Sequence, residues 1–250
     1  MSVLNENTII GASAAGGDYE IEQSLRFNKS DGTASLMRTP SVASNQKTWT
    51  WSGWVKKCGQ VTNSGLFDAR QTSTGQFTQL NFTTGDTLQF YTSMLGVDFS
   101  WESVPIYRDP SAWYHIVAVL NTPSSTQQDR FIVYVNGVRQ ANGNFYGALD
   151  QNVLGWVNST NPHSIGEVTD GGHHLDGYLA EVNFIDGQAL TPDSFGETSD
   201  YGEWKPLKYT GAYGTNGFYL PFKQDYAVEG FSTVLWEGSG TDGSSQYVGG

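Results

Sequence analysis

The sequence predicts an all-β protein, an antiparallel two-sheet sandwich of jelly-roll type, and three observations support this prediction. Short runs of aromatic and β-branched residues recur along the chain, separated by turn residues. Asn136-Gly137 stands between FIVYV and VRQ, a combination typical of a two-residue hairpin turn. Helical periodicity is nearly absent, and the chain has 30 glycines in 250 residues, which suits a protein with many turns.

The first half of the chain contains strand candidates bounded by turn residues. They lie at residues 24–27, 35–39, 48–57, 66–70, 77–83 and 87–93. The longest reads TWTWSGWVKK and alternates, so that Trp49, Trp51 and Val55 share one face while Trp54 lies on the other. We expect these tryptophans to pack in the core. Thr84-Gly85-Asp86 is expected to form a hairpin turn.

The second half contains the strongest strand signals. WYHIVAVLN (113–121) is apolar on both faces, which predicts a central strand covered on both sides, with His115 as a hydrogen-bonded core residue. Further strands are expected in FIVYV, SIGE, LDGYLAEVNFIDGQAL and GFYLPF. Thr191 and Pro192 begin one short helical turn. In such sandwiches the first and last strands are expected to meet.

The chain divides into three segments. Residues 1–20 are small, glycine-rich and weakly hydrophobic, so they form either a floppy terminus or an anchor peptide that orders against a neighbouring subunit. Ile9 and Ile10 would supply the apolar contacts of such an anchor. Residues 21–222 are expected to form the sandwich. Residues 223–250 form an extension or the start of a further segment.

The charge of the chain excludes several functions. Its net charge is −12, and its 13 Lys and Arg residues are scattered, whereas nucleic-acid binding requires a basic patch.

No apolar run approaches about 18 residues, so membrane insertion is not expected. The first residues lack the basic and apolar regions of a secretory signal, which predicts synthesis and folding in a cytoplasm.

Five segments occur in an order that resembles a laminin-G-like, concanavalin A-like lectin/glucanase domain across roughly residues 21–222. They are TWTWSGWVK, WYHIVAVLN, RFIVYVNGVRQ, SIGE and LDGYLAEVNFIDGQALTPDSFGE. The opening SLRFN and the segment GEWKPLKYTGAYGTNGFYLPF further resemble virion proteins of tailed bacteriophages, especially marine ones. The resemblance implies a concanavalin A-like jelly roll in a tail fibre, head fibre or other appendage of the virion, made in the host bacterial cytoplasm.

One segment partly matches a catalytic motif. Glucanases of this superfamily use two carboxylates in an E-x-D-x-x-E pattern, and the nearest match runs from Glu181 to Asp186 with Asn183 in the middle. Glu181 and Asn183 share a strand face, whereas Asp186 points the other way unless a β-bulge intervenes. Glycoside hydrolysis needs two carboxyl groups that face one sugar. The sequence therefore predicts a noncatalytic protein in which Glu181 is structural.

The segment 163–176 contains several side chains that can bind metal ions. Its histidines and carboxylates are His163, Glu167, Asp170, His173, His174 and Asp176. Adjacent histidines on an extended chain point to opposite sides, so we expect a solvated loop and no transition-metal site. Many laminin-G-like domains bind Ca²⁺ at a sandwich rim. Ca²⁺ is therefore the one cofactor considered, with Asp98, Asp170 and Asp176 as candidate ligands; no other cofactor is expected.

Ligand contacts are expected from two long aromatic segments, 99–110 and 144–162, which are interpreted as loops. Sugar binding on such folds stacks a ring on an exposed aromatic side chain beside polar groups. The candidate ligand contacts are Trp101, Tyr107, Arg108, Asp109, Tyr146 and Trp156. The alternative is that the aromatic side chains among them pack over a sheet edge.

The resemblance implies a noncatalytic phage virion structural protein, a tail-fibre or appendage subunit with a lectin-like domain. Its loops would contact host-surface polysaccharide or other virion subunits, and fibre proteins of this kind are commonly homo-oligomers, with a trimer as the expectation. Weak sites repeated on one particle gain avidity. Two alternatives stay open: a head fibre or capsid decoration module without a ligand, and a glycan hydrolase that depends on Glu181.

Overall fold

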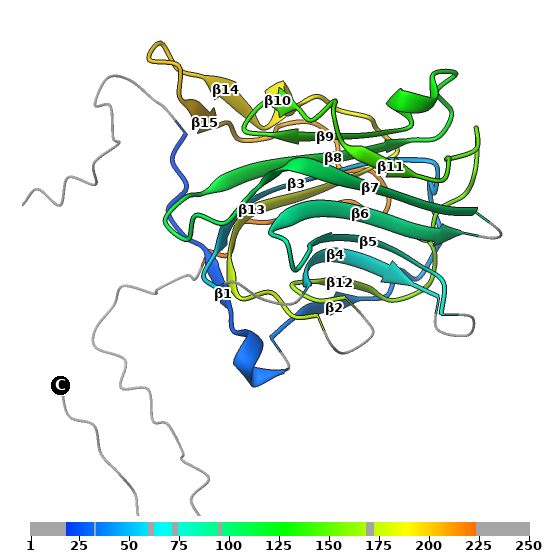
Figure 1. Cartoon of the computed structure of the whole chain (residues 1–250), viewed down its shortest axis with the longest axis horizontal. Helices are drawn as coiled ribbons and strands as arrows, with labels where there is room; N and C mark the ends of the chain where they lie inside the picture. Colours follow the sequence, from blue (N-terminus) through cyan, green and yellow to red (C-terminus); the bar gives the residue numbers. More distant parts are fainter. Residues whose placement is uncertain are drawn as a thin grey trace, which may run out of the picture.

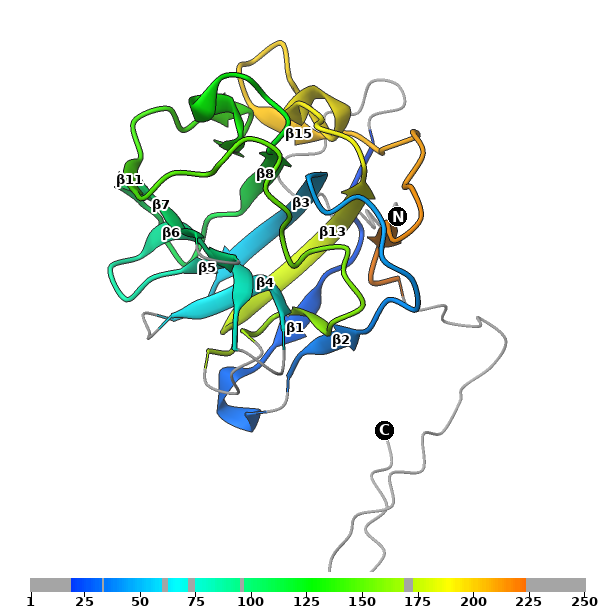
Figure 2. The ribbon, with the colours of Figure 1, turned by 90° about the vertical axis from the view of Figure 1, so that its right-hand side faces the viewer.

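Two seven-stranded antiparallel sheets pack face to face in the computed structural model of the chain (Figure 1). The structure describes residues 19–223 except 33, 60–62, 72–74, 95–96 and 169–172. Sheet A has the strand order β1-β13-β3-β8-β9-β10, and β16 also pairs with β13. Sheet B has the order β11-β7-β6-β5-β4-β12-β2. Figure 2 shows the two layers from the side. The predicted all-β, jelly-roll sandwich is thus confirmed.

The predicted strands agree closely with the observed bounds, but the structure also contains four strands that the sequence did not predict. Sheet A consists of β1 (Leu25–Phe27), β3 (Thr48–Lys57), β8 (Tyr114–Asn121), β9 (Phe131–Val135), β10 (Val138–Arg139), β13 (Gly177–Asp186) and β16 (Phe218–Leu220). Sheet B consists of β2 (Leu36–Arg38), β4 (Ser64–Arg70), β5 (Phe77–Phe82), β6 (Thr87–Met94), β7 (Val97–Ile106), β11 (Asn144–Tyr146) and β12 (His163–Ile165). A small third sheet pairs β14 (Gly196–Thr198) with β15 (Trp204–Pro206). The four strands that were not predicted are β7, β11, β14 and β15.

Helical structure in the described residues is confined to three short 3₁₀ turns. They are η1 (Lys29–Asp31), η2 (Gln127–Asp129) and η3 (Pro192–Ser194). The last follows Thr191, as the sequence predicts, although the Thr191 side chain makes no capping hydrogen bond. Within the described part of the chain, no helix has the length and hydrophobicity needed to cross a membrane.

Alternation along the strands places large aromatic side chains between the two sheets. Trp49 and Trp51 on β3 are 1% and 0% exposed, which confirms them as core residues. The Trp49 ring meets Phe67 of sheet B edge-on, with 6.2 Å between centroids. Phe90 and Phe131 stack across the interface at 3.8 Å. These contacts fix the two sheets against each other through dispersion and burial of apolar area.

The central strand β8 is covered on both faces, as its sequence predicts. Ile116, Ala118 and Leu120 point into the core between the sheets. Val117 and Val119 point outward and pack with Phe195 under the segment that follows β13. The chain from η3 through β15 therefore forms a partial third layer over sheet A, visible at the top of Figure 2.

Two predicted turns are confirmed by their backbone angles. Asn136 and Gly137 have φ values of 48° and 78°, the positive pair that a type I′ hairpin requires, between β9 and β10. The side chain of Asn136 also accepts a hydrogen bond from the backbone N–H of His115 at 2.8 Å. Asp86 has a φ of 61° in the turn between β5 and β6.

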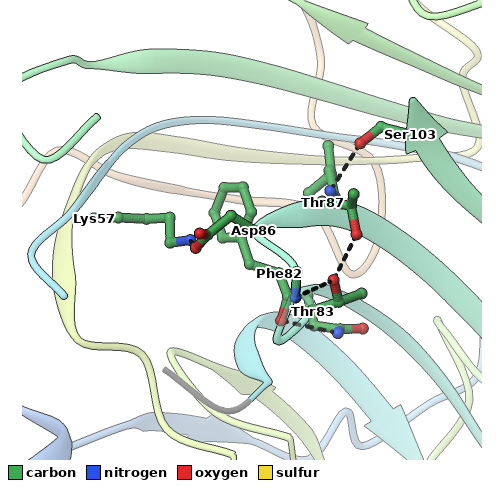
Figure 3. Close-up of polar contacts among 9 residues, drawn as sticks. Lys57, Phe82, Thr83, Asp86, Thr87 and Ser103 are labelled. Atoms are coloured by element: carbon green, nitrogen blue, oxygen red, sulfur yellow. Dashed lines mark hydrogen bonds and ion pairs between the residues drawn. The ribbon is translucent and has the colours of Figure 1, made fainter. Parts of the chain in front are cut away.

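A buried ion pair connects the two sheets at one end of the sandwich. Lys57 ends β3 in sheet A, and its ammonium group points at the carboxylate of Asp86 in the β5–β6 turn of sheet B (Figure 3). The two side chains are only 6% and 11% exposed. The Lys57 Nζ atom also lies 4.7 Å from the centroid of the Phe82 ring. The pair therefore links the sheets by charge as well as by packing.

The interpretation of residues 99–110 as a loop is wrong for residues 99–106, whereas residues 107–110 do lie in a connection between strands. Residues Val97–Ile106 form β7, the second strand from one edge of sheet B, and Trp101 on it is 2% exposed. Apolar Phe99 and Trp101 alternate with polar Asp98, Ser100 and Glu102, a period-2 pattern that predicts a strand. The segment 144–162 is a loop over most of its length, but it begins with the short strand β11.

The first and last described strands meet, but they do not pair with each other. β1 and β16 both pair with the same edge of β13, one on each side of an irregularity between Ala180 and Asn183. The segment 1–18, with Ile9 and Ile10, and residues 224–250 lie outside the described residues. The N-terminal arm and the C-terminal extension therefore stay predictions.

Candidate ligand-binding site

A pocket of about 460 Å³ lies on the outer face of sheet A, beside the partial third layer. This volume falls in the range of about 300–1,000 Å³ that small-ligand sites occupy. Its lining residues are Ile21, Glu22, Gln23, Ser24, Trp54, Trp113, Ala180 and Pro206.

The floor of the pocket follows from strand alternation. Trp54 lies on the face of β3 opposite to Trp51, so its ring points out of the sandwich and is half-buried. Ala180 on β13 pairs directly with Trp54, and its small side chain leaves room above the sheet. On the other side, His115 on β8 pairs with Trp54 and stacks on its ring, with 4.9 Å between centroids.

His115 is a neutral support for the Trp54 ring. The indole N–H of Trp204 donates to His115 Nδ1 at 2.9 Å, so the ring proton lies on Nε2, which donates to Ser52 Oγ at 2.9 Å. Burial lowers the pKa of His115 to about 3. With 1% exposure and two hydrogen bonds, His115 is the satisfied core histidine that the sequence predicts.

The walls come from three distant parts of the chain. Trp113 directly precedes β8, and its ring lies 6.5 Å from that of Tyr178. Pro206 ends β15. The third wall is the segment 21–24, which precedes β1 and contributes the polar side chains Glu22, Gln23 and Ser24. Two indole rings with a carboxylate, an amide and a hydroxyl can hold a ring that has one apolar face and several hydroxyl groups.

Three of the six residues predicted to contact a ligand pack inside the protein. Trp101 lies against Phe131 at 6.1 Å in the core. Tyr107 is 6% exposed beside Tyr114, and burial raises its pKa to about 12. Trp156 is half-buried and donates its indole N–H to the backbone oxygen of Ser93 at 2.8 Å. For these three rings the packing alternative describes what the structure shows.

The other three predicted residues are exposed but are not gathered together. Arg108 and Asp109 lie in the connection between β7 and β8. Asp109 accepts hydrogen bonds from the hydroxyl and the backbone N–H of Ser111, which lower the pKa of its carboxyl group. Tyr146 is 71% exposed on the edge strand β11, where it pairs with Ser100. Their roles in ligand contact stay predictions.

The prediction of core packing is wrong for Trp54, whose half-buried ring lines the pocket, and none of the pocket residues was predicted as a ligand contact, although one signal marks Trp54. On the outward face of β3 it follows Thr50 and Ser52, so it is the large apolar side chain on a polar face. Such a residue needs a partner outside the core. Here the partner is a second layer that sequence alone does not place.

The carboxylates of the hydrolase-like motif do not face one another across a substrate site. Glu181 accepts hydrogen bonds from the hydroxyl of Tyr219. Asp186 accepts one from Asn158 Nδ2 at 2.8 Å and one from the backbone N–H of Asn216 at 3.0 Å. Both carboxylates are thus engaged by the protein itself, and neither lines the pocket.

The candidate metal ligands are dispersed or paired. The interpretation of the histidines as a solvated loop is wrong for His163 and His174, which are 7% and 6% exposed. His174 Nδ1 lies 3.3 Å from Glu167 Oε2. Within the described residues, no three His, Cys, Asp or Glu side chains gather as a metal site would require. A Ca²⁺ site stays a prediction.

The Ca²⁺ candidates occupy three different settings. Asp98 is exposed on β7, and Asp176 pairs with Arg26 at 2.5 Å. Asp170 lies outside the described residues.

The sandwich of two large antiparallel sheets agrees with the superfamily that the sequence matches. Residues 31–194 match the concanavalin A-like lectin/glucanases superfamily, and the chain belongs to this superfamily. The predicted resemblance is confirmed at this level. A comparison with curated proteins gives no match.

Solved structures with similar chains come from diverse sources. The heptameric SAP-like pentraxin of Limulus polyphemus is 17% identical, with a TM-score of 0.43 over 62% of this chain and 70% of the pentraxin. Domains LG4-5 of the mouse laminin alpha1 chain are 10% identical, with a TM-score of 0.47 over 75% of this chain. The match covers 44% of the laminin chain, less than half its length.

A third similar chain is the CBM40 of the IT-sialidase from Ruminococcus gnavus, bound to alpha2,3 sialyllactose. It is 11% identical, with a TM-score of 0.43 over 63% of this chain and 95% of that one. Similarity at this level bears on neither the ligand nor the activity of the present chain.

Proposed function

We propose that this protein is a noncatalytic, lectin-like subunit that binds a glycan in the pocket over Trp54. One observation carries the proposal: an outward-facing indole ring, with neutral His115 stacked beside it, lines a cavity whose rim carries hydrogen-bonding side chains. A pyranose ring has the matching chemistry, because its C–H face stacks on an aromatic ring while its hydroxyls need polar partners.

The charge near the pocket selects among glycans. Glu22 places a carboxylate in the pocket wall, and the whole chain carries a net charge of −12. The net charge disfavours the approach of anionic sugars, whereas the Glu22 carboxylate is paired with Lys223 at 3.2 Å and adds little repulsion. The expected ligand is therefore a neutral or amino sugar within a bacterial surface polysaccharide.

The proposed setting is a tail fibre or other appendage of a bacteriophage virion, and its support is the sequence resemblance described above. A homo-oligomer, with a trimer as the expected form, would repeat the pocket on one particle. Repetition converts weak single sites into strong attachment through effective concentration. A low-resolution image of the particle that locates this subunit tests the setting separately from the pocket.

The pocket is tested with Trp54→Ala and with Tyr146→Ala as a matched aromatic variant on the other sheet. We expect the wild-type protein to bind members of an array of bacterial surface polysaccharides. Trp54→Ala should weaken the affinity at least about tenfold, corresponding to about 1.4 kcal/mol, by calorimetric titration. Tyr146→Ala should leave the affinity unchanged.

Two results would contradict this proposal. Loss of binding in Tyr146→Ala with full binding in Trp54→Ala would place the site on the outer face of sheet B. If the wild-type protein binds no polysaccharide on the array, the alternative of a head fibre or capsid decoration module without a ligand is favoured.

A further inference from the structure

Glu181 has an unusual backbone conformation beside the pocket. Its φ is 49°, in the left-handed region that non-glycine residues adopt at a cost of about 1–2 kcal/mol. It lies within the register shift of β13 between Ala180 and Asn183, so a β-bulge interrupts the alternation at this point. Its side chain is 6% exposed. Strain of this kind persists where surrounding contacts determine the conformation.

The carboxylate of Glu181 accepts a hydrogen bond from the hydroxyl group of Tyr219 on β16. The Tyr219 Oη atom lies 2.7 Å and 2.8 Å from the two oxygens of Glu181, so the hydroxyl donates to the carboxylate. Tyr19 Oη lies 3.1 Å from Tyr219 Oη. Because the Tyr219 proton is directed at Glu181, Tyr19 is the donor to Tyr219. We call Glu181, Tyr219 and Tyr19 the tyrosine–carboxylate cluster.

The environment keeps both hydroxyl groups protonated as donors. Burial raises the pKa of Tyr19 to about 12, and the negative charge of the nearby Glu181 carboxylate adds to the shift. The pKa of Tyr219 is raised in the same direction, first by burial and then by its contacts with Tyr19 and Glu181. Tyr213 supports the arrangement by stacking near Tyr219 and donating to Asn183 Oδ1 at 2.8 Å.

The cluster holds one end of the pocket wall. We call residues 19–24 the N-terminal strap; in Figure 1 it is the blue segment that runs from beside β15 down to β1. The strap begins at Tyr19 in the cluster and continues into β1, which is paired with β13. Between these two attachments, residues 21–24 line the pocket. Ala180, the neighbour of Glu181, lies in the pocket floor.

We propose that Glu181 is a positioning residue for the pocket: its carboxylate orients Tyr219, Tyr219 holds Tyr19, and the N-terminal strap is thereby kept in place as the wall facing Trp54. This role differs from that of a general acid, although Glu181 begins the segment that most resembles a hydrolase motif. The ligand part of this inference depends on the proposed function; the part about the strap does not.

A second contact alone is too weak to hold the strap. Lys223 Nζ lies 3.2 Å from Glu22 Oε2, but the two side chains are 56% and 65% exposed. Exposed ion pairs contribute about 0–1 kcal/mol. Removing the cluster should therefore loosen the beginning of the strap, residues 19–22, while β1 and the sheets stay folded.

Release of the strap can be measured without a ligand, using a glutamate-specific protease. Glu20 and Glu22 are exposed cleavage sites within the strap, and Glu197 on β14 is an exposed site outside it. We expect Glu181→Gln and Tyr219→Phe to raise the cleavage rate after Glu20 and Glu22 at least tenfold, while cleavage after Glu197 is unchanged. Tyr201→Phe, at a side chain that is 87% exposed, is the matched control and should behave as wild type.

Tyr19→Phe guards against loss of the fold, because it removes only the outermost hydroxyl and leaves β13 and β16 intact. It should also accelerate cleavage in the strap, although less than Tyr219→Phe. Unchanged cleavage after Glu20 and Glu22 in all three variants would overturn the inference. Faster cleavage after Glu197 as well would mean general unfolding and would also count against it for that variant, leaving Tyr19→Phe to decide.

A ligand arm separates this inference from the proposed function. With a polysaccharide that binds the wild type, Glu181→Gln should weaken the affinity at least threefold. If Trp54→Ala abolishes binding while Glu181→Gln changes neither affinity nor cleavage, the pocket stands and the positioning role is wrong. If Trp54→Ala binds normally, the proposed function fails, and the cleavage rates alone decide the role of Glu181.

Discussion

Lys57 and Asp86 show how much one pair of side chains contributes to holding the sheets together. An ion that leaves water loses solvation worth several kcal/mol, and the loss is offset only while its partner is present. Here the Lys57 ammonium group and the Asp86 carboxylate form an ion pair, and the ammonium group also lies over the Phe82 ring. The pair therefore makes the joining of the two sheets depend on both residues at once.

Asp86→Asn should lower the free energy of unfolding by about 3 kcal/mol, since it leaves the Lys57 charge buried and unpaired. Asparagine tolerates the positive φ of this turn, so the backbone is not the cause. Urea unfolding monitored by fluorescence measures the change. The double variant Lys57→Met with Asp86→Asn should recover most of the loss; a single variant as stable as wild type would show that the pair is already solvated.

At the residue scale the sequence predicted side chains whose role follows from alternation alone. Trp49 and Trp51 are core residues because every second position of β3 faces sheet B. His115 is buried because both faces of β8 are covered. The prediction for Trp101 is wrong because a long segment rich in aromatic residues is compatible with a loop as well as with a strand, and here the alternation of Phe99 and Trp101 with polar residues produces a strand.

Among the elements, the β9–β10 hairpin has a double function. Its Asn136-Gly137 turn reverses the chain, and the turn also packs against the partial third layer. A Cβ atom added at Gly137 would lie 2.5 Å from the Trp204 ring. Trp204 in turn donates its indole N–H to His115, which stacks beside Trp54. The hairpin thus contributes, through two rings, to the floor of the pocket.

Gly137→Ala should lower the free energy of unfolding by at least about 1 kcal/mol more than Gly202→Ala. Both glycines have positive φ, 78° and 84°, so backbone strain is matched. They differ in the room for an added methyl group, because no atom lies within 4 Å of a Cβ placed at Gly202. Thermal unfolding of the two variants measures the difference. Equal destabilisation would mean that the turn does not press on Trp204.

For the molecule as a whole, acid stability depends on histidines buried in both sheets. Burial lowers the pKa of His115 in sheet A to about 3 and that of His163 in sheet B to about 4. An unfolded histidine has a pKa of about 6.5. Below that pH the unfolded chain gains protons that the folded chain does not, so stability falls as the pH decreases towards these folded-state values.

Between pH 7 and pH 5 the free energy of unfolding should fall by about 2 kcal/mol for each of these two histidines. His115→Gln can keep both hydrogen bonds, to Ser52 and Trp204, without titrating. It should therefore remove about half of the pH-dependent loss, as measured by urea unfolding at the two pH values. An unchanged loss in this variant would show that His115 becomes protonated inside the folded protein.

The pocket could not be predicted from the sequence for a reason that belongs to the whole molecule. The sandwich itself follows from local alternation and turn residues, each readable in a short window. The pocket combines residues 21–24 with Trp54, Trp113, Ala180 and Pro206, from five segments. Only the register of β13 with β3 and the return of the chain over sheet A bring them together.

The arrangement of β1 and β16 on β13 also has a mechanical consequence. Leu25 pairs with Leu179 and Leu220 pairs with Val182, so the chain enters and leaves the sheet at neighbouring points on either side of Glu181. A load applied through the two flanking segments would first break the contacts of Tyr19 with Tyr219 and of Glu22 with Lys223, and would then reach these outermost pairs. It would peel each three-residue strand rung by rung, starting from the middle of β13, and the other strands would not share the tension at that stage.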